Sequence, residues 1–187
     1  MSVLPAAGEA RRSLESQGQW SPYRQGYRSM TTPTDACSTT LTLATGRLYL
    51  AKLVVDHRFA PAALDYYVSV AATTPTAGQC FAVLFDAAGA VVASKDAVTD
   101  FGSAGVKSLT LAGELSDQDY RFGLLFNGTT GPQIPRSTAA TGGPTFFNAN
   151  LAAAEYRGSY VDGQTSVPSP VAYASATAYI PLWAAIR

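Results

Sequence analysis

A β fold is indicated most clearly by the stretch Leu64-Asp65-Tyr66-Tyr67-Val68-Ser69-Val70, residues 64–70. Every second side chain from Leu64 onward is large and apolar, and the side chains between them are mainly polar. Because successive side chains of a strand point to opposite faces, this period of two predicts a strand with one buried face. We therefore expect Tyr66 in the core and Tyr67 on the polar face.

Similar short strands are predicted on both sides of this stretch, separated by turns rich in glycine and proline. Leu48–Val55 is expected to form one of them, with a β-bulge near Ala51 and Lys52, where the alternation slips. Phe81–Phe85 is apolar on both faces, so we expect a central strand covered on both sides. The predicted core takes large apolar side chains from all of these strands: Leu48, Leu50, Tyr66, Val68, Val70, Phe81, Val83, Phe85, Leu109, Leu111, Phe122, Leu124 and Phe126.

Roughly eight such strands, without a layer of helices, predict an all-β protein. We expect an antiparallel, jelly-roll-like β-sandwich over residues 39–187. Residues 1–38 differ, because their aromatic and basic stretch from Trp20 to Arg28 has neither a strand nor a helix period. We expect an extended N-terminal assembly arm that binds a partner and is not part of the sandwich. Its predicted anchors are aromatic rings and arginines, which bury large areas or pair with carboxylates: Trp20, Tyr23, Arg24, Tyr27 and Arg28.

The composition of the chain argues against nucleic acids and membranes as partners. The chain has 187 residues with 13 basic and 13 acidic side chains, so its formal net charge is zero. Such a chain creates no field that would gather phosphate backbones, and we expect no nucleic-acid partner. No apolar run reaches the ~20 residues that cross a bilayer, so we expect no membrane insertion. Only 14% of the residues are charged, which is common where much of a surface meets other subunits.

Residues that could carry chemistry are few. His57 is the only histidine, no Gly-x-Ser-x-Gly motif accompanies it, and Asp56 is expected to point away from it along a strand. The carboxylates at Asp117 and Asp119 lack the further oxygen ligands of a calcium loop. Cys37 and Cys80 are too few for a metal knuckle, and we expect both thiols to be unpaired. The sequence therefore predicts neither an enzyme nor a metal or cofactor site.

The stretch from Leu41 to Arg136 resembles a module of minor tail proteins and tail fibres of phages that infect actinobacteria. The residues that carry this resemblance are Gly46–Leu53, Leu64–Val70, Gly78–Ala90 and Asp119–Thr130. This resemblance implies a structural protein on the virion surface, assembled in the host cytoplasm. It also implies other virion proteins as partners and favours a homo-oligomer, with a trimer as the first choice.

Three functions are open at this point. The first is a structural virion protein, either a tail tip or fibre subunit that contacts tail proteins or a capsid decoration protein that contacts major capsid subunits. The second is a carbohydrate-binding module for host-surface glycans, for which exposed aromatic rings would be needed. The rings expected to contact a glycan or a partner are Tyr67, Tyr156, Tyr160 and Tyr173. The third is a small hydrolase, which lacks a recognisable acid, base and nucleophile.

Overall fold

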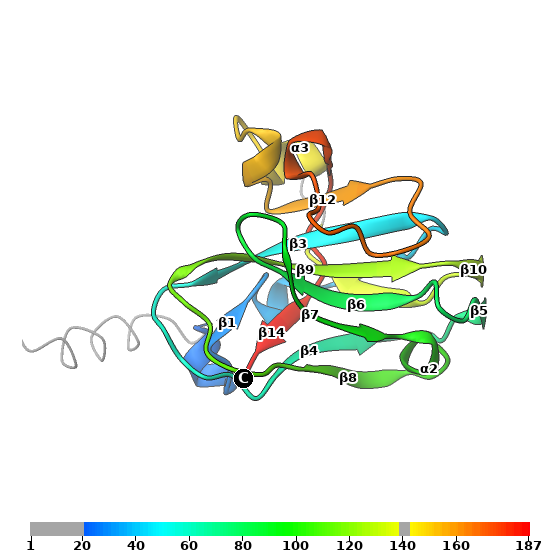
Figure 1. Cartoon of the computed structure of the whole chain (residues 1–187), viewed down its shortest axis with the longest axis horizontal. Coiled ribbons are helices and arrows are strands. Elements are labelled where there is room, and N and C mark those ends of the chain that lie inside the picture. Colours follow the sequence, from blue (N-terminus) through cyan, green and yellow to red (C-terminus); the bar gives the residue numbers. More distant parts are fainter. Residues whose placement is uncertain (1–20, 139–142) are drawn as a thin grey trace, which may run out of the picture.

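Two antiparallel sheets face each other in the structure, a computed structural model that describes residues 21–138 and 143–187 (Figure 1). The smaller sheet has four strands in the order β1 (Ser29–Met30), β14 (Ala184–Ile186), β4 (Ala63–Val68) and β8 (Gly105–Thr110). The larger sheet has six strands in the order β13 (Thr177–Ala178), β12 (Gly158–Val161), β3 (Arg47–Val55), β9 (Gln118–Phe126), β6 (Phe81–Phe85) and β7 (Val91–Asp96). The prediction of an all-β antiparallel sandwich is confirmed.

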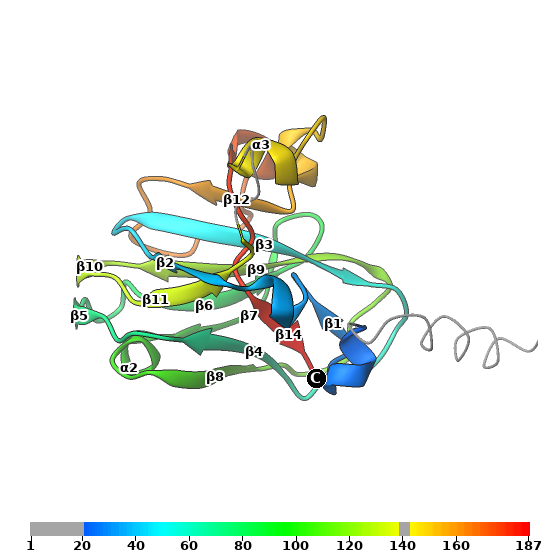
Figure 2. The same ribbon diagram turned by 180° about the vertical axis from the view of Figure 1, so that it is seen from behind.

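Short elements close the sides of the sandwich. The pair β2 (Thr39–Thr42) and β11 (Gln133–Arg136) lies in front of the two sheets in Figure 2, and the pair β5 (Thr73–Pro75) and β10 (Gly128–Thr130) lies at one end. The helical elements of the described residues are single turns or little more: η1 (Pro22–Gln25), η2 (Thr34–Ala36), α2 (Val98–Phe101), α3 (Gly143–Phe147), η3 (Ala153–Glu155) and η4 (Tyr173–Ser175).

The chain passes repeatedly from one sheet to the other. It runs from β3 across to β4 and back to β6, then through the β6–β7 hairpin, across to β8 and back to β9. The resulting orders, β1-β14-β4-β8 and β3-β9-β6-β7, place strands that are distant in sequence side by side. β12 and β13 extend the larger sheet beyond β3.

The main core fills the space between the sheets. It contains Leu64, Tyr66 and Val68 from β4, which face Phe122 and Leu124 of β9. Tyr66 is fully buried, whereas Tyr67 is 37% exposed on the outer face, so the predicted register of this strand is confirmed. The Tyr66 hydroxyl donates a hydrogen bond to Asp100, which supplies the partner that a buried phenol requires.

A second, smaller core lies on the other face of the six-stranded sheet. Leu48, Leu50, Val83, Phe85 and Leu125 point outward from that sheet and are covered by Val171 and Tyr173. β6 is therefore buried on both faces between β9 and β7, as its apolar sequence predicts.

The predicted bulge in β3 is wrong. β3 pairs with β9 without a break, from the pair of Arg47 with Phe126 to the pair of Val55 with Gln118. The alternation slips because the first half of β3 is covered by both cores, so apolar residues occupy both faces there.

Two members of the predicted core also lie elsewhere. Val70 is 49% exposed, because β4 ends at Val68 and the next residues turn to pair with Gln133 of β11. Phe81 is only partly buried, at the margin of the second core. The other predicted core residues are buried.

The N-terminal boundary of the sandwich also differs from the expected one at residue 38. β1 is a strand of the four-stranded sheet, with Ser29 opposite Ile186 and Met30 opposite Ala185. The backbone N–H groups of Arg28 and Thr31 donate to carbonyls of Ile186 and Ala184. Residues 21–38 therefore pack on the sandwich. The assignment of the earlier residues to an assembly arm stays a prediction, because residues 1–20 lie outside the described part.

Both thiols are free, as predicted: Cys37 is half-buried and Cys80 is buried. Burial raises the pKa of Cys37 to about 11, and Asp35 adds to this effect. Because the thiolate is the species that reacts, alkylation of Cys37 in the folded protein should be slow at pH 8 and accelerate about tenfold per pH unit toward pH 10.

Mass spectrometry with iodoacetamide and no reductant measures this rate, and Cys80 serves as the internal control that stays unlabelled. The unfolded chain should take two labels. A disulfide-linked chain that takes none would contradict the assignment of free thiols.

Candidate assembly surface

The predicted anchors within the described residues gather at one edge of the four-stranded sheet. Tyr23 and Arg24 lie in η1, and Gly26 ends this turn with a φ of 81°, a conformation that glycine adopts without strain. Tyr23, Gly26, Tyr27 and Arg28 line a shallow pocket of about 280 Å³. The Arg28 guanidinium lies over the Tyr23 ring, 5.6 Å from its centre. Trp20 lies outside the described residues.

Tyr23 also contacts the only histidine. Its hydroxyl lies 3.2 Å from Nε2 of His57, and the two rings are stacked. Asp56 contacts Nδ1 of His57, which contradicts the expectation that Asp56 points away. The reason is that β3 ends at Val55, so Asp56 belongs to a loop and is free of the alternation of a strand. Within residues 21–138 and 143–187, no serine or cysteine is hydrogen-bonded to His57, and this cluster fastens η1 to the loop.

Tyr27 joins the anchors to a second group of aromatic and apolar residues. Its ring meets the edge of Trp183, with ring centres 6.0 Å apart. Trp183 in turn lines an apolar pocket of about 210 Å³ together with Thr34, Cys37, Tyr67, Val106 and Pro135. We call the surface formed by Tyr27, Tyr67, Val106, Pro135 and Trp183 the aromatic face. It lies on the outer side of the four-stranded sheet.

Strand register explains why these side chains meet. Tyr67 of β4 is opposite Val106 of β8, and Trp183 directly precedes β14, the other neighbour of β4. Residues opposite each other in an antiparallel pair point to the same face. Val106 is 62% exposed and Tyr67 is 37% exposed, so the aromatic face presents apolar surface to solvent.

One end of the aromatic face is fixed by a buried carboxylate. Asp65 accepts hydrogen bonds from Nε of Arg187 at 2.8 Å and from the Ser108 hydroxyl at 2.6 Å. Burial raises the pKa of the nearby Tyr27, Asp65 raises it further, and Arg187 partly offsets the increase. Tyr27 is therefore a neutral phenol at physiological pH.

The other tyrosines predicted to contact a glycan or a partner lie apart from Tyr67. Tyr160 is in β12, on the six-stranded sheet, where it is half-buried under the guanidinium of Arg47. Tyr156 follows η3 and is also half-buried. Tyr173 belongs to the second core, and its hydroxyl donates to the carbonyl of Asp86. The prediction that Tyr173 is an exposed contact residue is therefore wrong.

Sequence reasoning missed most of the aromatic face. Trp183, Pro135 and Val106 are not among the residues that the sequence predicts to contact a partner. Only a model of strand pairing could have placed them beside Tyr67, because the contacts join positions far apart in the chain. The sequence indicated one member of this face, because Tyr67 was predicted to lie on the polar, exposed side of its strand.

Comparison of the sequence with protein-family models and with curated proteins finds no match. Within the described residues, no group of three histidine, cysteine or carboxylate side chains is placed to hold a metal ion. The same part of the chain contains no helix with the length and hydrophobicity needed to span a bilayer.

Proposed function

We propose that this chain is a structural subunit of a tailed-phage particle and that it binds other virion proteins through the aromatic face. The observation that carries this proposal is the exposed apolar surface around Tyr67 and Val106, continuous with the predicted anchor Tyr27. The resemblance of Leu41–Arg136 to tail and fibre modules supplies the class of particle.

The composition of the aromatic face suits an interface. Protein interfaces are enriched in tyrosine, tryptophan and arginine near their centres, and exposed apolar patches mark such sites. Tyr67 and Trp183 of this face line its apolar pocket, the Tyr27 ring lies against Trp183, and Arg28 lines a second pocket together with Tyr27. Its partner is a tail protein or a major capsid subunit, and a homo-oligomer, with a trimer favoured, is the proposed form in the particle.

A charge placed on the aromatic face should prevent attachment. Val106→Asp should lower the occupancy of the chain in purified particles by about tenfold or more, because an unpaired carboxylate would be buried in the interface. Quantitative mass spectrometry of particles produced with the variant measures this occupancy.

Val92→Asp is the matched control, since Val92 is an exposed strand valine, 41% accessible, on β7 of the other sheet. It should leave occupancy within about twofold of the unmodified chain. Absence of the unmodified chain from purified particles would reject the virion assignment. Equal occupancy for both variants would reject the aromatic face as the attachment surface.

The alternative function is binding of host-surface glycans by the same pocket, which two aromatic rings, those of Tyr67 and Trp183, line. Sugar rings stack on aromatic side chains. Titration of the protein with cell-wall glycan fragments, followed through tryptophan fluorescence, distinguishes the two functions. A saturable change that Tyr67→Ala abolishes would favour the glycan module.

A further inference from the structure

The pocket of the aromatic face, of about 210 Å³, has a buried hydrogen-bond donor without an acceptor in its wall. Trp183 is only 7% exposed, and its indole Nε1 makes no hydrogen bond with any described residue. The backbone N–H of Trp183 is satisfied, because it donates to the Pro135 carbonyl at 2.9 Å. Buried indole N–H groups normally find a partner, so the unpaired one indicates a missing acceptor at this pocket.

A second unpaired donor lies next to the same wall. The Thr34 hydroxyl, which lines the pocket, donates to Oε1 of Gln25 at 2.7 Å. Nε2 of the same amide is buried and has no partner among the described residues. Every buried side-chain atom that lacks a partner in residues 21–138 and 143–187 is a nitrogen donor, and no acceptor is in that position. The site therefore calls for a ligand that accepts hydrogen bonds.

The remaining wall of this pocket is apolar or aromatic. None of its lining residues carries a charge: Thr34, Cys37, Tyr67, Val106, Pro135 and Trp183. An ionic ligand would lose its hydration there without gaining a counter-charge. The occupant that suits the wall is uncharged and apolar, accepts a hydrogen bond and brings no donor of its own.

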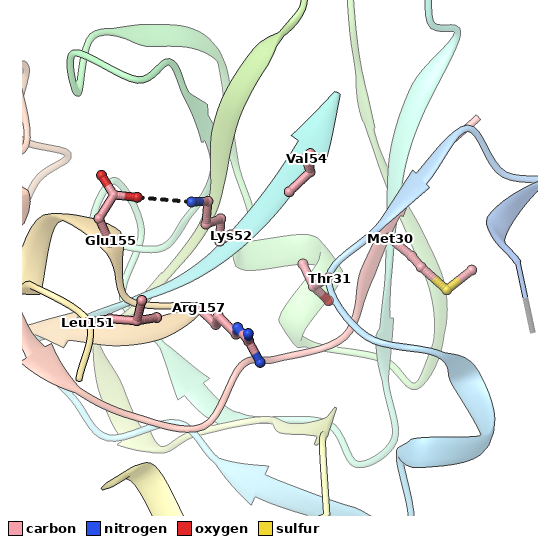
Figure 3. A pocket seen from close by; sticks show the side chains of 7 residues that line it. All are labelled: Met30, Thr31, Lys52, Val54, Leu151, Glu155 and Arg157. Carbon is pink, nitrogen blue, oxygen red and sulfur yellow. Dashed lines mark hydrogen bonds and ion pairs between the residues drawn. The ribbon is translucent and has the colours of Figure 1, made fainter. Parts of the chain in front are cut away.

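The larger pocket of the molecule, of about 470 Å³, has a different character (Figure 3). It lies between the β1 segment, β3 and the segment that carries η3. Its Lys52 is paired with Asp119 and, at 3.1 Å, with Glu155. None of its lining residues, all within the described part of the chain, has a buried polar side-chain atom without a partner. The missing acceptor is thus a property of the aromatic face.

We propose that the pocket of the aromatic face binds a proline-containing extended segment of a partner protein, with a carbonyl oxygen of that segment accepting from Nε1 of Trp183. The proline ring is apolar, and its amide has a carbonyl acceptor but no N–H. This proposal rests on the proposed function, because it names the chemistry of the partner that the aromatic face recognises.

Two physical reasons favour such a segment. Proline-rich segments dock in grooves lined by aromatic rings, and their polyproline II conformation exists before binding, so little entropy is lost. Tyr67 and Trp183 supply the two rings of this pocket. A sugar matches the wall less well, because each of its hydroxyl groups brings a donor that would need an acceptor.

The test uses the full chain labelled with ¹⁵N and the peptide acetyl-Ala-Pro-Pro-Ala-Pro-Pro-Ala-amide. The chain has two tryptophans and therefore two indole N–H signals, and Trp20→Phe assigns them. We expect a saturable downfield shift of the Trp183 indole proton as the peptide is added, because a hydrogen bond to a carbonyl oxygen deshields this proton.

A matched peptide and three variants test the chemistry by isothermal titration calorimetry. The peptide with alanine at every proline regains N–H donors and loses the polyproline II preference, so it should bind about fivefold more weakly or worse. Trp183→Phe keeps a ring and removes the donor, and it should weaken binding about three- to tenfold. Tyr67→Ala, at a partly exposed position, should weaken binding about fivefold. Val92→Asp, on the other sheet, should leave binding unchanged.

Equal affinity for the two peptides would overturn the proposal. An indole signal of Trp183 that the proline peptide leaves unchanged at millimolar concentration would also overturn it. The same holds if oligomers of N-acetylglucosamine shift this signal and the peptide does not, or if the signal depends on protein concentration without peptide. Loss of particle occupancy for Val106→Asp without peptide binding would retain the aromatic face as the attachment surface and reject only its proline ligand.

Discussion

Phe85→Ala is expected to cost about 3–5 kcal/mol of unfolding free energy, the range for truncation of a buried phenylalanine. Phe85 is fully buried in the second core, under Val171 and Tyr173. Its ring lies against Gly123, where even a Cβ would come within 3.0 Å of it. A site this closely packed can collapse only partly around a cavity, so the loss should lie well above the average for point variants.

Urea unfolding followed by circular dichroism measures the effect of Phe85→Ala. Phe146→Ala is the matched control, because Phe146 is 60% exposed, and it should change stability by less than about 1 kcal/mol. Similar losses for the two variants would show that the second core contributes little to stability.

Asn148→Ala is expected to cost about 2–4 kcal/mol, because each buried polar group left unpaired costs about 1–3 kcal/mol. The buried Asn148 side chain donates through Nδ2 to the carbonyls of Pro144, Gly158 and Tyr179. Its Oδ1 accepts from the backbone N–H of Arg157 at 2.8 Å. One amide thus joins α3, the start of β12 and the segment before β14.

Thr145 of the same short helix is polar and exposed, so it provides the matched control for thermal unfolding measurements. Thr145→Ala should leave the midpoint unchanged to within about 2 °C. If Asn148→Ala has an equally small effect, the segment around α3 is not held to the sandwich by this side chain.

The sequence predicts the fold best where one face of a strand is buried. Residues 64–68 alternate cleanly, and the placement of Tyr66 inside and Tyr67 outside follows from that pattern alone. The same reasoning fails for β3, because the pattern of a strand covered by two cores resembles a bulge. It fails for Val70 because alternation does not indicate where a strand ends.

The candidate site was less predictable than the fold. Tyr27 and Tyr67 were both predicted to contact partners, but nothing local indicates that Trp183 would bring them to one face. β1 has only two residues, Ser29 and Met30, and its pairing with β14 is a contact between opposite ends of the described chain. Such pairings depend on the order of strands in the sheet, and the alternation of apolar and polar residues within a strand does not indicate that order.

The position of β14 has a consequence for synthesis of the protein. β14 lies between β1 and β4, so the four-stranded sheet has a gap until residues 184–186 have left the ribosome. At about 5–20 residues per second, β1 waits on the order of ten seconds or more for this partner. A nascent chain therefore exposes unpaired strand edges throughout translation. A product terminated before Ala184 lacks the strand that joins β1 to β4.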